Sequence, residues 1–379
     1  MHRPARRFIT TLLRPFLLPF LMPVNPDTHQ PSPADESIPK RGNDVTAAGH
    51  SQQLGWWSAS LLRFLGNIIR RVRQPSLFVI TYHRVLPRPD PLLDGEPDVA
   101  AFHWQMALLS KCFNVMPLYD ALRALDEGRL PPRTICVTFD DGYRSVHDLA
   151  LPILRKFNLP ATVFVTTSYI GGKGGNMWND RIINAVQSLP DGILDLTDIG
   201  LGSYPLTSVE TRHAAVLRVT EAGKYLPPDE RDSLIQRLDR MGGNTPVPLM
   251  LEPEMLVTLE RNGVELGGHT ISHPILTSLD DERARHEIGG GKRELEAMTG
   301  KPARLFAYPN GKPGDDFDAR HVAMVREAGF SAAFTTAIGA VTADHGRFEL
   351  PRSRPWDSTA FRFGLRLLYW LALGNRQPR

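Results

Sequence analysis

The sequence predicts an α/β fold built around a parallel sheet, either open or closed into a barrel. Short apolar segments rich in β-branched residues indicate buried strands, and segments with helical spacing of apolar residues lie between them. This alternation predicts repeated βα units, whose ligands bind at the carboxyl ends of the strands. In the first half of the chain we predict strands at residues 76–82, 114–117, 134–139 and 161–166 and helices at residues 102–112, 118–128 and 146–157.

The alternation lapses between about residues 190 and 250, where Pro and Gly clusters separate helical pieces such as residues 230–241. We interpret this stretch as a helical insertion in a domain that spans residues 76–355. The alternation then resumes, with helices predicted at residues 252–262, 280–299 and 318–329 and strands at residues 264–266, 304–308 and 332–335.

Residues 1–53 are predicted to be a leader followed by a disordered linker. The arginine-containing apolar start is similar to a signal or anchor segment, but Arg14 and three prolines interrupt it. A poorly ordered leader and an over-extended start of the reading frame therefore stay open. From Asn25 onward the chain is rich in Pro, Ser, Asp and Gly, a composition typical of a disordered linker.

Two basic amphipathic segments, residues 54–75 and 356–379, flank the domain. In the first, Trp56 and Trp57 at one end and arginines at the other fit a helix that lies in a membrane interface. The alternative is a helix packed on the domain's own core, with arginines placed near its C-terminus by the helix dipole. Neither segment is a clear transmembrane span.

The overall composition excludes several classes of site. A net charge of +3 over 379 residues is too small and too scattered to indicate nucleic-acid binding. The chain has two cysteines, Cys112 and Cys136, which excludes a disulfide framework and a CxxC metal site.

An Asp-Asp-Gly sequence follows the predicted strand at 134–139. Adjacent residues of an extended chain face opposite ways, so a turn must redirect either Asp140 or Asp141, and Gly142 permits such a turn. The same sequence is common in solvated turns. Its place at the carboxyl end of a predicted strand favours a functional role.

Two histidines, His269 and His273, follow the predicted strand at 264–266. Because they are four residues apart, we expect them to lie on one face of a helical turn and to reach one metal ion. Together with one aspartate they form a 2-His-1-carboxylate set, which leaves coordination positions for water and substrate. The second aspartate is then left to act as a base.

Three motifs in this order, TFDDG (138–142), HTISHP (269–274) and FAYPNG (306–311), resemble the NodB-like polysaccharide deacetylase family. The resemblance extends from about Ser76 to Arg354 and implies a distorted (β/α) barrel, in agreement with the alternation above. Four further motifs are similar to the subgroup of exopolysaccharide and poly-N-acetylglucosamine deacetylases. They are TYHRV (81–85), PATVFV (160–165), MWND (177–180) and FELPR (348–352).

The resemblance implies the roles of the four residues found first. Asp141, His269 and His273 would bind one divalent metal ion, usually zinc, which lowers the pKa of bound water to about 7 and polarises the amide carbonyl. Asp140 would be the base that takes a proton from this water.

The resemblance also suggests substrate contacts. Aligned on the third motif, the backbone N–H of Asn310 would stabilise the oxyanion, and Tyr308 and Pro309 beside it would contact the substrate. In MWND, Trp178 is a candidate sugar platform and Asp180 a candidate partner for a sugar hydroxyl. Packing of Trp178 in the protein interior is the alternative.

The chain departs from the family in two places. Many members have an Arg in the third motif that braces the catalytic Asp, where this chain has Ala307, and the late Leu-x-His motif that supplies the general acid is absent. We expect His83, at the end of the first strand, to supply the acid, with a structural His bonded to a loop as the alternative. Arg352 or Arg354 is the candidate brace for Asp140.

The sequence therefore predicts a metal-dependent hydrolase that removes an N-acetyl group from an amino sugar of an envelope or extracellular polysaccharide. One alternative is deacetylation or deformylation of an undecaprenyl-linked sugar, which the basic flanking segments favour. Another is a catalytically silent glycan-binding relative. The expected partners are a glycan or a lipid-linked sugar, and the expected location is the cell envelope, in peripheral association with a membrane.

Overall fold

A parallel sheet forms the centre of the structure. The computed structural model describes residues 56–72, 74–172, 175–242, 247–355 and 357–374. The strands of the sheet are β1 (Ser76–Tyr82), β2 (Asn114–Val115), β3 (Thr134–Phe139), β4 (Ala161–Val165), β7 (Val264–Gly268), β8 (Leu305–Ala307), β9 (Ala332–Phe334) and β10 (Val341–Thr342). Within the described residues their order is β10-β1-β3-β4-β7-β8-β9, with β2 beside β3. All pairs are parallel except β10, which runs antiparallel to β1.

The register of β1 and β3 places two predicted site residues side by side. Both strands are apolar and β-branched, as expected for strands buried on both faces. They end together at the paired residues Tyr82 and Phe139. The next residues, His83 and Asp140, therefore leave the sheet at the same edge, where the backbone N–H of Asp140 donates to the carbonyl of Tyr82 (2.9 Å).

A short segment late in the chain bridges the two sides of the curled sheet. Leu350 forms a parallel bridge with Phe334 of β9, and Ser353 forms one with Ile80 of β1. Because this segment lies between β9 and β1, the sheet curls into the distorted (β/α) barrel that the sequence predicts. The same segment carries Arg352 into the interior, where 1% of its surface is exposed.

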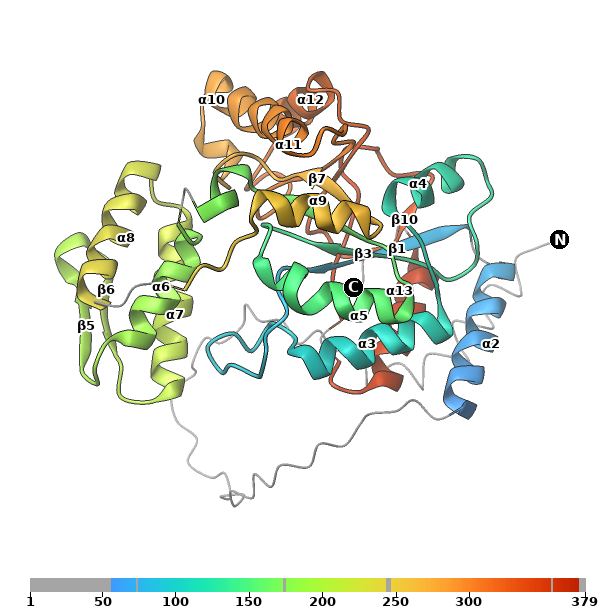
Figure 1. The fold of residues 1–379 in the computed structure, drawn as a ribbon, viewed down its shortest axis with the longest axis horizontal. Coiled ribbons are helices and arrows are strands. Elements are labelled where there is room, and N and C mark those ends of the chain that lie inside the picture. Colours follow the sequence, from blue (N-terminus) through green and yellow to red (C-terminus); the bar gives the residue numbers. More distant parts are fainter. Residues whose placement is uncertain (1–55, 73, 173–174, 243–246, 356, 375–379) are drawn as a thin grey trace, which may run out of the picture. The chain divides into compact units, whose positions relative to one another are not determined.

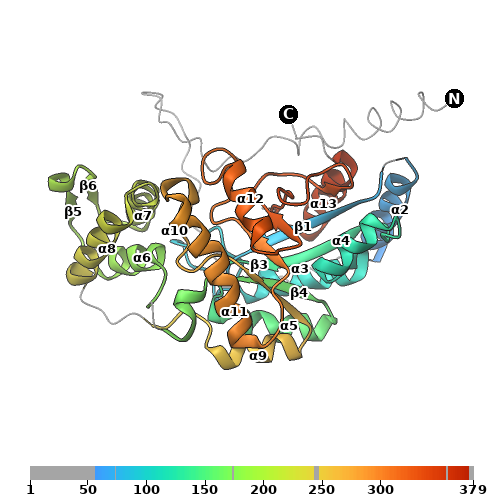
Figure 2. The same ribbon diagram turned by 90° about the horizontal axis from the view of Figure 1, so that it is seen from above.

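Helices surround the sheet (Figures 1 and 2). Two regions predicted as single helices each contain a π-helical turn, which widens the helix locally. The helices are α3 (Val99–Cys112), α4 (Leu118–Asp126), η2 (Val146–Ala150), α5 (Leu151–Phe157), α9 (Pro253–Arg261), α10 (Asp281–Arg285), η6 (His286–Gly290), α11 (Gly291–Thr299) and α12 (Ala319–Glu327), of which η2 and η6 are the π-helical turns.

The insertion has a small apolar core of its own. It consists of α6 (Trp178–Ser188), the antiparallel hairpin β5 (Ile193–Leu196) and β6 (Gly202–Pro205), α7 (Val209–Lys224) and α8 (Pro228–Gly242). The insertion is thus helical, as predicted, but it also contains a hairpin and includes α6, upstream of residue 190. In Figure 1 these elements, coloured green to yellow, form a separate cluster beside the barrel.

The C-terminal helix α13 (Ala360–Leu373) packs on the barrel itself. Phe363 and Leu367 are fully buried, and the ring of Trp370 stacks on that of Phe78 with 4.8 Å between centroids. The helix also contacts α2 (Trp56–Val72) and α3. The apolar face of this helix therefore packs on the domain's own core.

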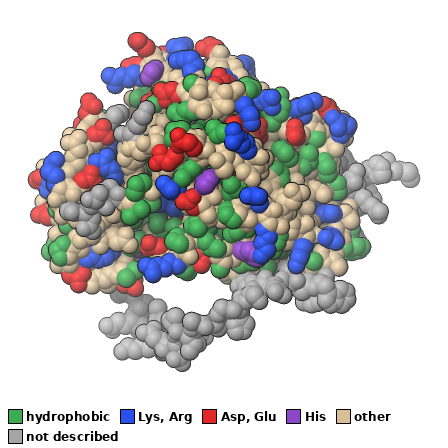
Figure 3. Space-filling view, in the orientation of Figure 1, with side chains coloured by type: hydrophobic (Ala, Val, Ile, Leu, Met, Phe, Trp, Pro, Cys, Tyr) green, Lys and Arg blue, Asp and Glu red, His purple; other side chains and the backbone are tan. Residues whose placement is uncertain are grey.

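The N-terminal helix α2 also packs inward but retains exposed apolar residues. Leu62 is fully buried, whereas Leu61 is 38% and Phe64 63% exposed. Residues 1–53 and the side chains of Trp56, Trp57, Arg70 and Arg71, on which the sequence predictions for this end depend, lie outside the described residues. Among the described helices none is long and apolar enough to cross a membrane. Acidic and basic side chains are interspersed over the face shown in Figure 3.

Candidate active site

Asp141, His269 and His273 come together at the carboxyl edge of the sheet. Their ligand atoms all lie within 4.8 Å of one another. The Nε2 atoms of both histidines are 3.5 Å from Oδ1 of Asp141. Two ligands about 2.1 Å from a tetrahedral zinc ion stand about 3.4 Å apart, so this spacing suits a shared ion.

Both histidines have surroundings that suit a metal ligand. Nδ1–H of His269 donates to the carbonyl of Ala307 (2.7 Å), which leaves the lone pair of Nε2 facing Asp141. Burial lowers the pKa of His273 to about 4, although the charge of Asp141 opposes this shift. Oδ1 of Asp141 is buried and has no hydrogen-bond partner in the described part of the chain. The oriented Nε2 of His269, the lowered pKa of His273 and the unpartnered carboxylate oxygen of Asp141 fit a divalent cation.

Asp141 reaches this position through a γ-turn. Its φ is 73°, and the N–H of Gly142 donates to the carbonyl of Asp140 (2.9 Å) across it. The turn that the sequence requires after β3 is therefore centred on Asp141, followed by Gly142 at φ 90°. A conformation that non-glycine residues rarely adopt is typical of functional positions. Burial raises the pKa of Asp141, but the neighbouring His269, His273 and His83 lower it by more, so the pKa lies well below its usual range.

The segment that carries both histidines is a loop, and the predicted helical turn is wrong. Thr270 and His273 have φ values of 66° and 59°, outside the helical region. The carboxylate of Glu287 accepts hydrogen bonds from the N–H groups of Ile271 and Ser272 (both 2.9 Å) and from the Ser272 hydroxyl (2.7 Å). A helix would use these N–H groups internally, so the tertiary contact replaces the helical one and still brings the two histidines together.

Asp140 lies beside the metal ligands and is held by Arg352. Nη1 of Arg352 donates to Oδ1 of Asp140 (2.6 Å) and Nη2 donates to Oδ2 (2.7 Å). Nε of Arg352 donates to the carbonyl of Thr335 (3.3 Å), and the guanidinium lies over the ring of Phe164. Of the two candidate braces, Arg352 is therefore the one that contacts Asp140.

His83 faces the same carboxylates and has an acidic partner of its own. Its Nδ1 is 3.2 Å from Oε1 of Glu96, whose other oxygen is 3.3 Å from Nη1 of Arg354. The His83 side chain is 47% exposed. Partial loss of water around the ring opposes its charge, but the hydrogen bond and charge of Glu96, with the charges of Asp141 and Asp140, outweigh this and raise the pKa of His83 to about 9. Arg354, the other candidate brace, thus supports Glu96.

Asn310 follows β8 in a second γ-turn. Its φ is 57°, and the N–H of Gly311 donates to the carbonyl of Pro309 (2.6 Å). The N–H of Asn310 donates to no acceptor within the described residues. The carbonyl of Ala307, three residues earlier, is the partner of His269, which ties this segment to the metal ligands.

Three of the predicted substrate contacts, Trp178, Tyr308 and Pro309, are buried. Trp178 is 8% exposed in the core of the insertion, with Arg231 over its ring, so the packing alternative describes it and the sugar-platform prediction is wrong. The ring of Tyr308 is buried and stacked on Phe317, and its hydroxyl donates to the carbonyl of Phe348 (3.0 Å). Pro309 is buried. The sequence alone does not show whether an aromatic side chain in a motif faces the ligand or packs in the interior.

Asp180 is bound by protein groups. It pairs with Arg84, and the hydroxyl of Tyr143 donates to its Oδ2 (2.9 Å). Asp180 also lines a pocket, so its contact with a sugar hydroxyl stays a prediction. Arg84, Glu96 and Glu287 were not predicted as partners, because a single charged residue in a loop or helix does not reveal which distant group it faces.

The chain is similar to a known family over more than half of its length. The family model described as polysaccharide deacetylase matches residues 127–333, more than half of the chain. A poly-beta-1,6-N-acetyl-D-glucosamine N-deacetylase of Staphylococcus epidermidis is 28% identical over 113 residues, which cover 25% of this chain and 38% of that protein. The putative polysaccharide deacetylase YxkH of Bacillus subtilis is 19% identical over 287 residues, covering 76% of this chain and 74% of that protein.

The fold has a match among solved structures. The Streptococcus pyogenes deacetylase PplD, solved in complex with acetate, aligns with a TM-score of 0.53 and 16% identity, covering 78% of this chain and 99% of that chain. This likeness shows a shared barrel fold. The family match, the three motifs and the barrel agree, and the chain belongs to the polysaccharide deacetylase family.

Proposed function

We propose that this protein removes the N-acetyl group from amino-sugar units of an envelope or extracellular polysaccharide, in a metal-dependent hydrolysis. The observation that carries the proposal is the place of Asp140, braced by Arg352, beside the convergent Asp141, His269 and His273. Three protein ligands with an open position are typical of catalytic zinc sites. The family match and the printed activity of the Staphylococcus epidermidis relative support the choice of substrate class.

Each residue of the site has a separate role in the proposed reaction. A divalent cation held by the three ligands, such as zinc, supplies Lewis acidity for the amide carbonyl and makes water acidic. Asp140 accepts the proton of the attacking water as the new C–O bond forms. The N–H of Asn310, which has no acceptor among the residues that the structure describes, is the donor for the developing oxyanion. His83, protonated at pH 7, donates a proton to the amine nitrogen as the C–N bond breaks.

A chelation and reconstitution experiment tests this proposal. The substrate is a β-1,6-linked oligomer of N-acetylglucosamine, and released acetate is measured for the purified, the chelated and the zinc-reconstituted protein. We expect chelation to abolish acetate release and about one equivalent of zinc to restore it. Full activity in a protein shown to be free of metal would contradict the metal-dependent chemistry.

For location, we propose that α2 lies against a membrane surface at the cell envelope. The exposed rings and side chains of Phe64 and Leu61 on this helix support the proposal, because exposed apolar residues beside basic ones favour the membrane interface. Co-sedimentation with anionic vesicles tests it. We expect wild-type protein to sediment with vesicles and Phe64→Asp to remain in solution, whereas equal recovery of both would refute the proposal.

A further inference from the structure

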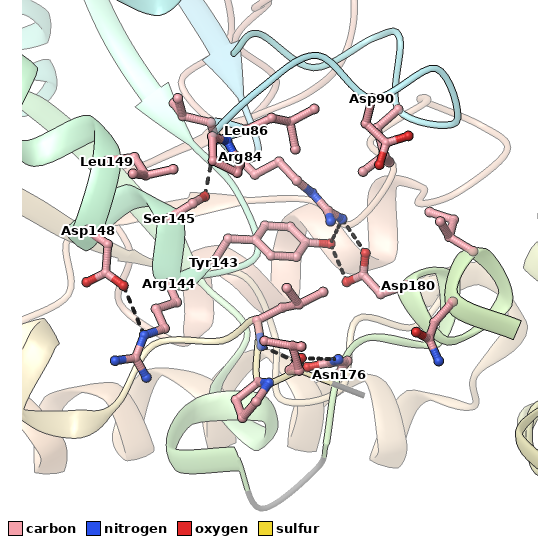
Figure 4. Close-up of a pocket in the computed structure, with 18 of the residues that line it drawn as sticks. Arg84, Leu86, Asp90, Tyr143, Arg144, Ser145, Asp148, Leu149, Asn176 and Asp180 are labelled. Atoms are coloured by element: carbon pink, nitrogen blue, oxygen red, sulfur yellow. Dashed lines mark hydrogen bonds and ion pairs between the residues drawn. The ribbon is translucent and has the colours of Figure 1, made fainter. Parts of the chain in front are cut away.

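Ion pairs join the insertion to barrel loops that carry groups of the candidate site. Figure 4 shows the pair between Asp180 of α6 and Arg84, which directly follows His83. At the end of α7, Nζ of Lys224 lies 3.2 Å from Oδ1 of Asp316, in the loop that follows β8. Charged side chains of the insertion therefore reach two loops of the site.

The loop after β8, which contains Asn310, is closed on itself. The rings of Tyr308 and Phe317, near its two ends, stack with 3.7 Å between centroids. Between them the N–H of Asp316 donates to the carbonyl of Lys312, and the N–H of Lys312 donates to Oδ2 of Asp316 (both 2.9 Å). Because these contacts join the two halves of the loop, a displacement of Asp316 would also shift Asn310.

The carboxylate of Asp316 is fully buried, so its charge needs a partner. In the described part of the chain, Lys224 is the cation that pairs with it. The Lys224 side chain is 18% exposed, so the pair is largely shielded from salt. Removal of the cation would leave an uncompensated buried charge, which is strongly unfavourable. Lys224 of the insertion thus keeps Asp316 in the interior.

The metal ligands and the candidate base have other supports. Glu287 binds the backbone between His269 and His273. Arg352 binds Asp140. Neither support belongs to the insertion, so a change at Lys224 should leave the metal site intact.

We propose that Lys224 is a positioning residue for the oxyanion donor, the N–H of Asn310. The inference rests on the proposed function, because it assumes that this N–H meets the charge that develops on the amide oxygen. Lys224 acts through Asp316, which fixes the loop. A shift of about 1 Å in a reacting arrangement can lower the rate by about 10²-fold. The insertion therefore contributes to the rate although the metal ligands lie outside it.

Lys224→Met tests the proposal. Acetate release from a β-1,6-linked pentamer of N-acetylglucosamine gives kcat and KM, and bound zinc is measured in the same samples. We expect kcat to fall by about tenfold or more, with KM within about twofold of wild type and zinc content unchanged. Lys224→Arg keeps the charge and should retain most of the rate. Arg237→Met is the matched control, because Arg237 pairs with Asp198 inside the insertion (2.6 Å) and should be dispensable.

Two further measurements separate positioning from a general loss of structure. Adding Asp316→Asn to Lys224→Met removes the unpaired charge, so the double variant should recover part of the lost kcat. Hydrogen exchange of residues 308–317 should be faster in Lys224→Met than in wild type. Thermal unfolding shows whether each variant is folded, and Lys224→Gln replaces Lys224→Met, with the same expectations, if the latter does not fold.

Several outcomes would overturn the inference. They are wild-type kcat in Lys224→Met, a loss seen in KM alone, a loss of zinc together with the rate, and a double variant no faster than Lys224→Met. If wild type releases no acetate from any substrate, the proposed function fails instead. Hydrogen exchange then decides whether Lys224 holds the loop: faster exchange in Lys224→Met supports this, and unchanged exchange refutes it.

Discussion

Arg352 binds both carboxylate oxygens of Asp140, at 2.6 and 2.7 Å, although the two residues are 212 positions apart. The contact depends on the segment that joins β9 to β1, because this segment carries Arg352 to the end of β3. The third motif has Ala307 where many relatives have an arginine. The segment between β9 and β1 therefore supplies the arginine that holds Asp140, the proposed catalytic base.

Replacement of Arg352 should lower kcat by a larger factor than it changes KM. Arg352→Met leaves Asp140 buried without a partner, which costs about 3–5 kcal/mol of unfolding free energy. Arg352→Lys keeps the charge but loses the paired hydrogen bonds, so we expect a folded protein with kcat reduced about 10²-fold and KM little changed. Arg347→Met, at a surface pair with Asp126, is the control. Wild-type kcat in Arg352→Lys would show that the brace has no catalytic role.

Glu96 should set the upper limit of the pH range for activity. Burial acts to lower the pKa of His83, and Glu96 is the main group that raises it, to about 9. Removing this carboxylate lowers the pKa, so His83 loses its proton at a lower pH. In Glu96→Gln, we therefore expect the descending limb of the kcat/KM profile to move to lower pH. Asp94→Asn, in the same loop but exposed, should leave this limb in place.

An unshifted limb in Glu96→Gln would exclude His83 as the acid that this limb reports. The raised pKa of His83 should also make the stability of the folded protein fall at high pH. Because the folded pKa exceeds the ordinary value of 6.5, the contribution of His83 to stability is complete below about pH 6.5 and is lost as the pH rises through about 9.

Glu287 should control metal affinity without contacting the metal. It binds the backbone between His269 and His273, and Gly291 lets the helix approach closely, since a Cβ there would lie 2.8 Å from the backbone of Thr270. We expect Glu287→Ala to weaken zinc binding about 10–100-fold in a chelator competition. Glu287→Gln should recover part of the lost zinc affinity.

The control for Glu287 is Glu296→Ala. Glu296 also accepts a backbone hydrogen bond, from Ala303, but away from the metal ligands. Equal zinc affinities in Glu287→Ala, Glu296→Ala and wild type would show that the loop keeps its shape without Glu287.

Trp370 should contribute strongly to stability. It is 7% exposed and stacked on Phe78, so Trp370→Ala should lower the unfolding free energy by about 3–5 kcal/mol. Phe64→Ala removes an equally apolar but largely exposed ring and should change stability by no more than about 0.5 kcal/mol. Similar losses in both, measured by denaturant unfolding, would contradict the packing described for α13.

The barrel and the metal ligands were predictable because both depend on local patterns. Buried strands are short apolar runs, and the carboxyl ends of parallel strands meet at one edge. Asp141, His269 and His273 follow two such strands, β3 and β7, so a site at this edge could be expected from the strands, whereas the family resemblance was needed to name Asp141 rather than Asp140 as the ligand. Arg352 was predictable only as one of two candidates, with Arg354, because the third motif has Ala307 where many family members have an arginine.

The remaining features depend on contacts between distant residues. The backbone of Thr270 and His273 leaves the helical region because Glu287 binds the loop, and spacing alone favoured a helical turn. Trp178 and Tyr308 lie in motifs beside the site, but each ring turns into a core that the sequence does not locate.

Bound metal and acetate release, measured together on Asp140→Asn and Asp141→Asn, test the central claim most directly. Asp140 contacts Arg352 and Asp141 belongs to the metal ligands, so the two substitutions should separate the functions. We expect Asp140→Asn to retain the metal while acetate release falls about 10²–10⁴-fold. We expect Asp141→Asn to lose both. An Asp141→Asn protein with wild-type metal content and wild-type acetate release would contradict the account.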